Sequence, residues 1–115
     1  MVNDLRNTYT KQPFEQLPID VNFGSLTVLP RGAKEIVASV ALAKKWKRTS
    51  PDSPEDATSE FLDSSTPQIL APNNCKVRVQ VKGGISGYDY QVTVRVTFDN
   101  GAKLEEELYI RVQER

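Results

Sequence analysis

An alternation of apolar and polar residues near the C-terminus limits the possible folds more than any other feature of this chain. Every second side chain is apolar across residues 75–81 and again across 88–98. This period of two is the pattern of a half-buried strand, whereas a helix repeats every 3.6 residues. Gly83, Gly84 and Gly87 lie between the two segments and indicate a turn. We therefore expect two consecutive strands here.

The residues after the second segment predict how it pairs with the last strand. A two-residue Asn100-Gly101 loop would mix the apolar and polar faces. A three-residue Asp99-Asn100-Gly101 loop, with Gly101 left-handed in a bulge, keeps each face uniform. We therefore expect the three-residue loop, which leaves Glu106 facing inward opposite Val94, a position that the pattern does not explain. The predicted pairs are Val96–Leu104, Val92–Leu108, Tyr90–Ile110 and, on the outer face, Arg95–Glu105.

The N-terminal half gives weaker patterns. Residues 17–23 alternate as in a half-buried strand, and a short apolar piece at 26–29 precedes a turn at 30–32. Residues 34–48 are ambiguous, because alanine and lysine favour helix while positions 36, 38, 40 and 42 alternate. The other face of this segment is nearly apolar too, which is the pattern of a strand buried on both faces. We therefore predict a strand, with a helix as the alternative. The predicted core comprises Ile19, Val21, Ile36, Val40, Leu42, Val77, Val79, Tyr90, Val92, Val94, Leu108 and Ile110.

Together these elements predict an all-β fold. Six or seven short strands with little helix favour an antiparallel β-sandwich, with a small closed barrel as the second choice. Residues 1–16 have little apolar content and are expected to form an extended arm, either frayed or ordered by a partner. Residues 17–115 form the single domain. Residues 49–67 contain three prolines and five acidic residues without a basic one, which indicates a long acidic loop with Phe61-Leu62 as a possible edge strand.

The composition excludes much chemistry. The 115 residues include no histidine, so Ser-His and Cys-His catalytic pairs and histidine metal clusters are absent. The lone Cys75 excludes internal disulfides and suits a reducing compartment. Fifteen basic residues balance fifteen acidic ones, which gives no overall basic field for nucleic acid or an anionic membrane. We expect no enzyme activity, no cofactor, no bound metal, no membrane span, and synthesis in a cytoplasm without a signal peptide.

One basic and one acidic segment are the candidate contacts with a partner. The basic run contains a single tryptophan, which is weak evidence for single-stranded nucleic acid. A contact with the nearby acidic loop explains its charge more simply, and a contact with another protein is the other alternative. The acidic residues lack the glycine and final glutamate of a calcium loop. The candidate partner contacts are Lys44, Lys45, Trp46, Lys47, Arg48, Asp52, Glu55 and Asp56.

Other polar groups are better explained by structure than by chemistry. Glu105, Glu106 and Glu107 alternate along a strand and cannot converge on one ion. The three glycines at 83–87 lack the lysine and the following helix of a phosphate loop. Tyr88 and Tyr90 could stack on a sugar, but a hydroxyl bonded to the backbone at a strand end is favoured.

Several stretches of the chain resemble one family. It resembles small virion proteins of tailed bacteriophages, often described as fiber–tail adaptors, over most of its length. The resemblance rests on Tyr9-Thr10-Lys11-Gln12-Pro13, Leu17-Pro18-Ile19-Asp20, the 36–43 strand, Val81-Lys82-Gly83-Gly84, Gly87-Tyr88-Asp89-Tyr90-Gln91-Val92-Thr93-Val94 and Asn100-Gly101.

The resemblance implies a fold, a role and partners. The fold is an immunoglobulin-like sandwich, and the role is that of a non-enzymatic adaptor or assembly subunit at the tail, neck or fibre attachment region. The implied partners are other virion proteins. The charges further suggest copies of the chain in a symmetric ring, in which the acidic loop of one subunit meets the basic segment of the next head to tail, although pairing within one chain explains the charges equally well. The alternatives are a sandwich that binds glycans or the host surface, which an exposed aromatic platform would favour, and a head decoration protein.

Overall fold

The fold was obtained from a computed structural model that describes residues 8–23, 33–71 and 74–114. The apolar piece expected at 26–29 and the turn at 30–32 lie outside these residues. The described residues are mostly strand, with one short helix. Its elements are β1 (Thr8–Lys11), β2 (Leu17–Asn22), β3 (Ile36–Lys47), β4 (Ser50–Asp56), α2 (Thr58–Phe61), β5 (Gln68–Leu70), β6 (Lys76–Val81), β7 (Tyr88–Phe98) and β8 (Lys103–Val112).

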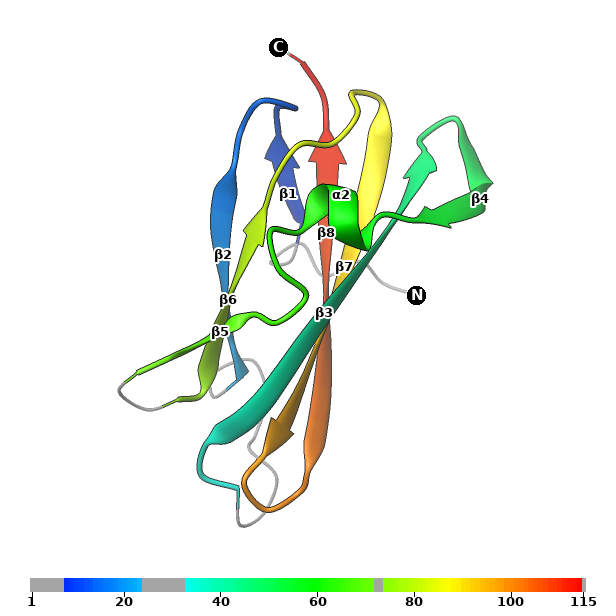
Figure 1. The fold of residues 1–115 in the computed structure, drawn as a ribbon. Helices are drawn as coiled ribbons and strands as arrows, with labels where there is room; N and C mark the ends of the chain where they lie inside the picture. Colours follow the sequence, from blue (N-terminus) through cyan, green and yellow to red (C-terminus); the bar gives the residue numbers. More distant parts are fainter. Residues whose placement is uncertain (1–7, 24–32, 72–73, 115) are drawn as a thin grey trace.

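Two sheets pack face to face, which confirms the predicted β-sandwich. The larger sheet has the strand order β1-β8-β7-β3-β4, and the smaller one has the order β2-β6-β5. β1 runs parallel to β8, and the other neighbours are antiparallel. In Figure 1 the smaller sheet lies to the left of β8 and β7, and α2 lies in front of β8.

The core fills the space between the sheets with the residues that alternation placed inward on β2, β6, β7 and β8. Every second side chain is buried along most of β6 and β7, in the middle of β2, and over Leu108–Val112 of β8. The β7–β8 register matches the predicted three-residue loop, and Gly101 is left-handed with φ 87°. All the predicted cross-strand pairs form, and Arg95 Nε lies 2.7 Å from Glu105 Oε1. Glu106 stands opposite Val94 and is only half-buried, at the margin of the core.

The strand expected over 34–48 is confirmed as β3, but its inward face was predicted wrongly. Val40 and Leu42 are 40% and 42% exposed, whereas Ala41 and Ala43 are buried. The cause is a register shift between Ile36 and Ala38, where β3 carries one extra residue relative to β7. A bulge of one residue reverses which side chains face the core. Ile36 therefore points inward before the bulge, and odd-numbered residues point inward after it.

The small inward side chains of Ala41 and Ala43 leave room for residues 57–65, which run alongside β3. Ala41 N donates to Ser65 O at 2.8 Å, and Ala57 N donates to Ala43 O at 2.9 Å. Residues 57–65 thus provide hydrogen-bond partners for Ala41 N and Ala43 O of β3, which β4 does not reach because it pairs only with Lys44–Lys47. The buried Phe61 and Leu62 then fill the volume that larger side chains at 41 and 43 would occupy.

The acidic stretch contains more regular structure than the loop that was expected. Ser50–Asp56 forms β4, and Thr58–Phe61 forms α2. Phe61 ends the helix and Leu62 makes an isolated bridge with Val81, in place of the predicted edge strand. Pro51 and Pro54 are compatible with β4 because it lies at a sheet edge, where a missing N–H is tolerated. Composition alone could not reveal this strand, since its pairing depends on β3.

Part of the expected arm also belongs to the sheet. Thr8–Lys11 pairs with Tyr109–Val112 in parallel, and residues 1–7 lie outside the described residues. Parallel pairing next to the C-terminal strand is a long-range contact that a local pattern does not predict. With β1 and β4, the described residues contain eight strands rather than six or seven.

A matched pair of leucine truncations tests the corrected face of β3. Leu42→Ala is expected to change the free energy of unfolding by less than about 1 kcal/mol, because much of that side chain already meets water. Leu108→Ala should cost about 2–5 kcal/mol, because Leu108 is buried on β8. Urea unfolding monitored by circular dichroism measures both. Equal losses would show that Leu42 faces the core.

Candidate functional site

The basic and acidic candidate residues lie side by side in one hairpin. β3 and β4 pair antiparallel, so that Lys44 stands opposite Asp56 and Lys45 opposite Glu55. Opposite charges directly across two strands attract one another. The two segments thus lie next to each other, and one ion pair, between Lys45 and Glu60, joins the basic run to the acidic stretch.

Two of the basic side chains are engaged inside the molecule. Lys45 Nζ lies 2.9 Å from Glu60 Oε1, and this hydrogen bond is the main reason that the pKa of Lys45 is raised. Arg48 Nε donates to Asp89 Oδ1 at 3.1 Å, and its Nη2 donates to Val112 O at 3.2 Å. These contacts tie the hairpin to α2, β7 and β8. Lys45 and Arg48 therefore have structural roles.

The rest of the hairpin faces outward. Lys44, Lys47 and all of Ser50–Asp56 are exposed, while Trp46 is half-buried opposite Asp89. In Figure 1 this hairpin projects at the upper right corner of the sandwich, on the side away from the smaller sheet. The candidate contacts thus divide into an internal set, Lys45 and Arg48, and an outward set that includes Lys44, Lys47 and β4.

The three consecutive glutamates do not form a reactive cluster. Glu105 pairs with Arg95, while the Tyr109 hydroxyl donates to Glu107 Oε1 at 3.0 Å. Burial and this carboxylate raise the pKa of Tyr109. In the part of the chain that the structure describes, no group of three or more Asp, Glu or Cys side chains could hold a metal ion.

The tyrosine and glycine motifs have structural roles. Tyr90 is buried, stacks on Phe61 with ring centroids 4.0 Å apart, and accepts a hydrogen bond from Ile85 N at 2.9 Å. This is the predicted contact of a hydroxyl with the backbone at a strand end. Burial raises the pKa of Tyr90. Gly83, Gly84 and Gly87 all have positive φ, as turn residues.

The sequence patterns did not predict that Lys11 is a buried cation. Lys11, at the end of β1, is 0% exposed. Its ammonium group donates to Gly83 O and, at 2.7 Å, to Gln12 O, and it lies 5.9 Å from the centre of the Phe61 ring. Burial lowers the pKa of Lys11, and the nearby Glu15 charge acts in the opposite direction. Because its partners are mainly backbone carbonyls, no residue type in the sequence signals this site.

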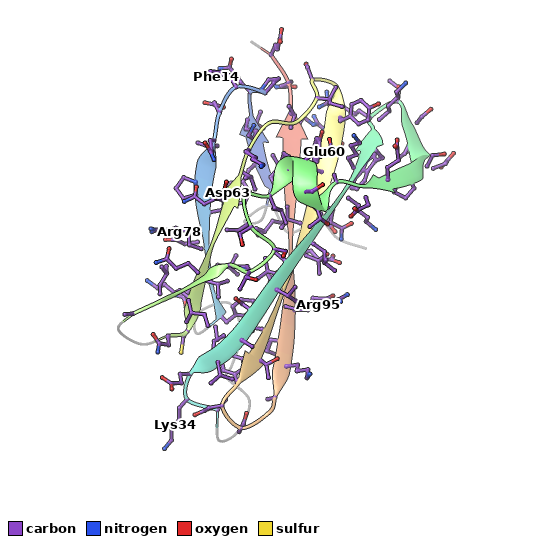
Figure 2. The ribbon with its side chains drawn as sticks, viewed as in Figure 1. Phe14, Lys34, Glu60, Asp63, Arg78 and Arg95 are labelled. Carbon is purple, nitrogen blue, oxygen red and sulfur yellow. The ribbon has the colours of Figure 1, made fainter. Side chains whose placement is uncertain are left out.

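The turn that follows Lys11 presents an exposed aromatic ring. Glu15 N donates to Gln12 O at 3.1 Å, and Gln12 N donates to Glu15 Oε1 at 2.7 Å. Pro13 restricts the backbone further. Phe14 is 97% exposed at the tip of this turn, and Figure 2 shows it at the end of the sandwich where β1 joins β2. We call residues 12–15 the Phe14 turn.

Substitution of Lys11 tests its structural role. Lys11→Met keeps most of the side-chain volume but removes the ammonium group, so Gly83 O loses this donor, while Gln12 O keeps the hydrogen bond from Glu15 N. The expected cost is about 1–3 kcal/mol in the free energy of unfolding at neutral pH, measured in urea. The exposed Lys47→Met is the control and should change stability by less than about 0.5 kcal/mol. Equal effects would contradict a structural role for the Lys11 ammonium.

The outer face of the larger sheet carries an apolar hollow. The outward side chains of Ala38, Val40, Thr97 and Lys103 line a shallow depression of about 430 Å³ on β3, β7 and β8, which we call the sheet hollow. Arg95 and Glu105 border it and also border a second depression, over Leu42 and Lys44, that reaches β4. The hollow exists because the bulge in β3 directs Val40 away from the core.

Three comparisons with known proteins add to this geometry. The family model Gp77, described as podophage GP4 fiber-tail adaptor protein gp77, matches residues 11–111. No curated protein and no solved structure matches significantly. Among the described residues, no helix has both the length and the apolar character needed to cross a membrane. The match runs from the end of β1 into the end of β8, so it covers both sheets.

Proposed function

The chain belongs to the Gp77 family of podophage fiber-tail adaptor proteins, and from this membership we propose that it is a non-enzymatic subunit at the junction of tail and fibre. The family makes it a structural adaptor of the phage tail, a component of the virion and a partner of other tail proteins. The finer proposal is its place, where the tail meets the fibres. The single observation that carries it is the family match over residues 11–111.

The described surface supports an assembly role better than a glycan-binding one. Among the described residues, Phe14 is the aromatic side chain that is largely exposed, and a single ring does not form a platform for sugars. The exposed β3–β4 hairpin and the Phe14 turn project from the sandwich instead. We propose that residues 17–115 act as one domain, with the preceding arm attached through β1.

Removal of the protein from the particle tests the adaptor role. A phage with an amber codon in place of Lys34 is grown on a host without a suppressor, and its particles are purified. We expect filled heads with tails that lack fibres, seen by electron microscopy and by loss of fibre protein in mass spectrometry. Growth on a suppressor host that inserts lysine is the control. Fibres at normal number on particles without this chain would overturn the proposal.

We further propose that several copies form a ring around the tail axis and that the hairpin contacts a neighbouring virion protein. The outward residues Lys44 and Lys47, with Asp52, Glu55 and Asp56, supply charges of both signs at one corner. Charges at the rim of an interface mainly direct which partner associates.

A double charge reversal tests the hairpin contact. Lys44→Glu combined with Lys47→Glu should leave the free energy of unfolding within about 1 kcal/mol, because both side chains are exposed. The copy number of the chain per particle should fall at least tenfold, measured by quantitative mass spectrometry. Lys45 is left intact because it pairs with Glu60. Lys76→Glu, an exposed lysine on β6, is the control. A normal copy number for the double variant would exclude the hairpin contact.

A further inference from the structure

We propose that the Phe14 turn of one copy docks into the sheet hollow of a second copy. This inference rests on the proposed ring and names the two surfaces that join its subunits. Three observations support it. The Phe14 ring is exposed on a hydrogen-bonded turn, the sheet hollow is large enough for such a ring, and the two lie too far apart to meet within one molecule.

The structure holds Phe14 firmly while leaving its side chain in water. Two hydrogen bonds between Gln12 and Glu15 close the turn. The buried ammonium group of Lys11, the residue before the turn, donates a further hydrogen bond to Gln12 O. A fully exposed phenylalanine gains nothing from folding. Because the turn is already ordered, docking of this ring would cost little conformational entropy. Buried aromatic anchors of this kind carry much of the energy of protein interfaces.

The sheet hollow offers a matching surface. Ala38 and Val40 supply apolar contacts, and the volume of about 430 Å³ accommodates a phenylalanine side chain. Val40 is 40% exposed although it lies in the middle of a long strand. Water over these side chains would be released when an apolar group covers them.

Charge around the two surfaces is complementary. The Glu15 carboxylate is fixed beside Phe14 by its bond to Gln12 N. Lys103 lies in the lining of the sheet hollow and is exposed. Docking of Phe14 brings an acidic group toward a basic one, which favours this orientation over one between like charges.

The two surfaces cannot meet within one molecule. Lys11, at the base of the Phe14 turn, pairs with Val112 at one end of β8, while Lys103 lies at the other end. Nine strand residues separate these ends by roughly 30 Å. Figure 2 shows Phe14 at the upper left of the molecule and Arg95, which borders the hollow, lower down on the right. A Phe14 turn that docks into a sheet hollow must therefore belong to a second copy, and a head-to-tail contact of this kind closes into a ring if its rotation permits.

Phe14 is an anchor rather than the whole interface. A phenylalanine buries about 150–250 Å². A specific interface buries about 1,200–2,000 Å² in total, so neighbouring side chains must contribute. The second depression over Leu42, continuous with the hollow at Arg95 and Glu105, extends the apolar surface toward β4.

Cross-linking in assembled particles tests the contact. Phe14→Cys and Val40→Cys are combined in one chain with Cys75→Ser, and purified virions are oxidised with copper phenanthroline. We expect a ladder of covalent multimers on a non-reducing gel, which reductant collapses. Phe14→Cys with Ile85→Cys is the matched control, since Ile85 is a similarly exposed apolar residue outside the hollow, and should give no ladder. Absence of the ladder, or an equal ladder in the control, would overturn the proposal.

A second variant covers the case in which the cysteine chains enter particles poorly. Phe14→Ser is expected to lower the copy number per particle at least tenfold with unchanged urea stability, whereas Ile85→Ser should leave both unchanged. A normal copy number for Phe14→Ser would overturn the docking. These outcomes differ from failure of the adaptor role, which appears only as normal fibres on particles that lack the chain.

Discussion

Val79→Asp is expected to lower the free energy of unfolding by about 4–5 kcal/mol, enough to unfold a domain near the lower limit of ordinary stability. Val79 is buried in the centre of β6, opposite Ile19 on β2. A carboxylate there would lose its hydration without gaining a partner. Circular dichroism and urea unfolding measure the loss.

The neighbouring residue supplies a control for this prediction. Gln80 is exposed on the same strand, so Gln80→Asp introduces the same carboxylate on the outer face. It should cost less than about 1 kcal/mol. If both variants were equally stable, β6 would not lie with Val79 inside the sandwich.

Gly84→Ala is expected to cost about 2–5 kcal/mol through two separate effects. Gly84 has φ +98°, where a side chain strains the backbone. An added Cβ would also lie 2.9 Å from Val112 Cγ2 and 3.2 Å from Phe61 Cε1, so that the core must shift. Urea unfolding of purified protein measures the combined loss.

Gly87→Ala separates the two effects. Gly87 has a similar φ of +91°, but an added Cβ would meet no atom within 4 Å. That variant carries the backbone strain alone and should cost about 1–2 kcal/mol. A loss at Gly87 as large as that at Gly84 would show that the contacts with Val112 and Phe61 are unimportant.

The sequence predicted best those elements whose pairing is set locally. The Asp99-Asn100-Gly101 turn determines the register of β7 and β8, because a left-handed glycine permits a bulge that keeps both faces uniform. Two strands joined by a short turn need no information from elsewhere in the chain. The pairs Val92–Leu108 and Arg95–Glu105 follow directly.

The errors occurred where distant residues decide the structure. The inward face of β3 depends on a bulge near Val37 that follows from its pairing with β7. Strand β4 depends on the end of β3, and its proline-rich acidic sequence resembles a loop. Lys11 is buried because Gly83, 72 positions away, offers a carbonyl. None of these contacts leaves a periodic pattern in the sequence.

The candidate contact residues were only partly distinguishable from the sequence. The run of basic residues from Lys44 to Arg48 looked uniform, yet the fold gives Lys45 and Arg48 internal partners and leaves Lys44 and Lys47 outside. Alternation within a strand explains part of this division. The remainder depends on where α2 places Glu60.

The bulge in β3 also gives the chain a place where its length can change without altering the face that it presents to its neighbours. Ile36 pairs with Phe98 and Ala38 with Thr97, so residue 37 is the extra residue of the bulge. Its deletion would restore regular pairing and leave Val40 and Leu42 outside and Ala41 and Ala43 inside. A one-residue deletion between Ala38 and Ala43 has no such extra residue to remove, and it would exchange the two faces on one side of the deletion. Related phages could therefore differ by one codon at position 37 and keep the same exposed surface.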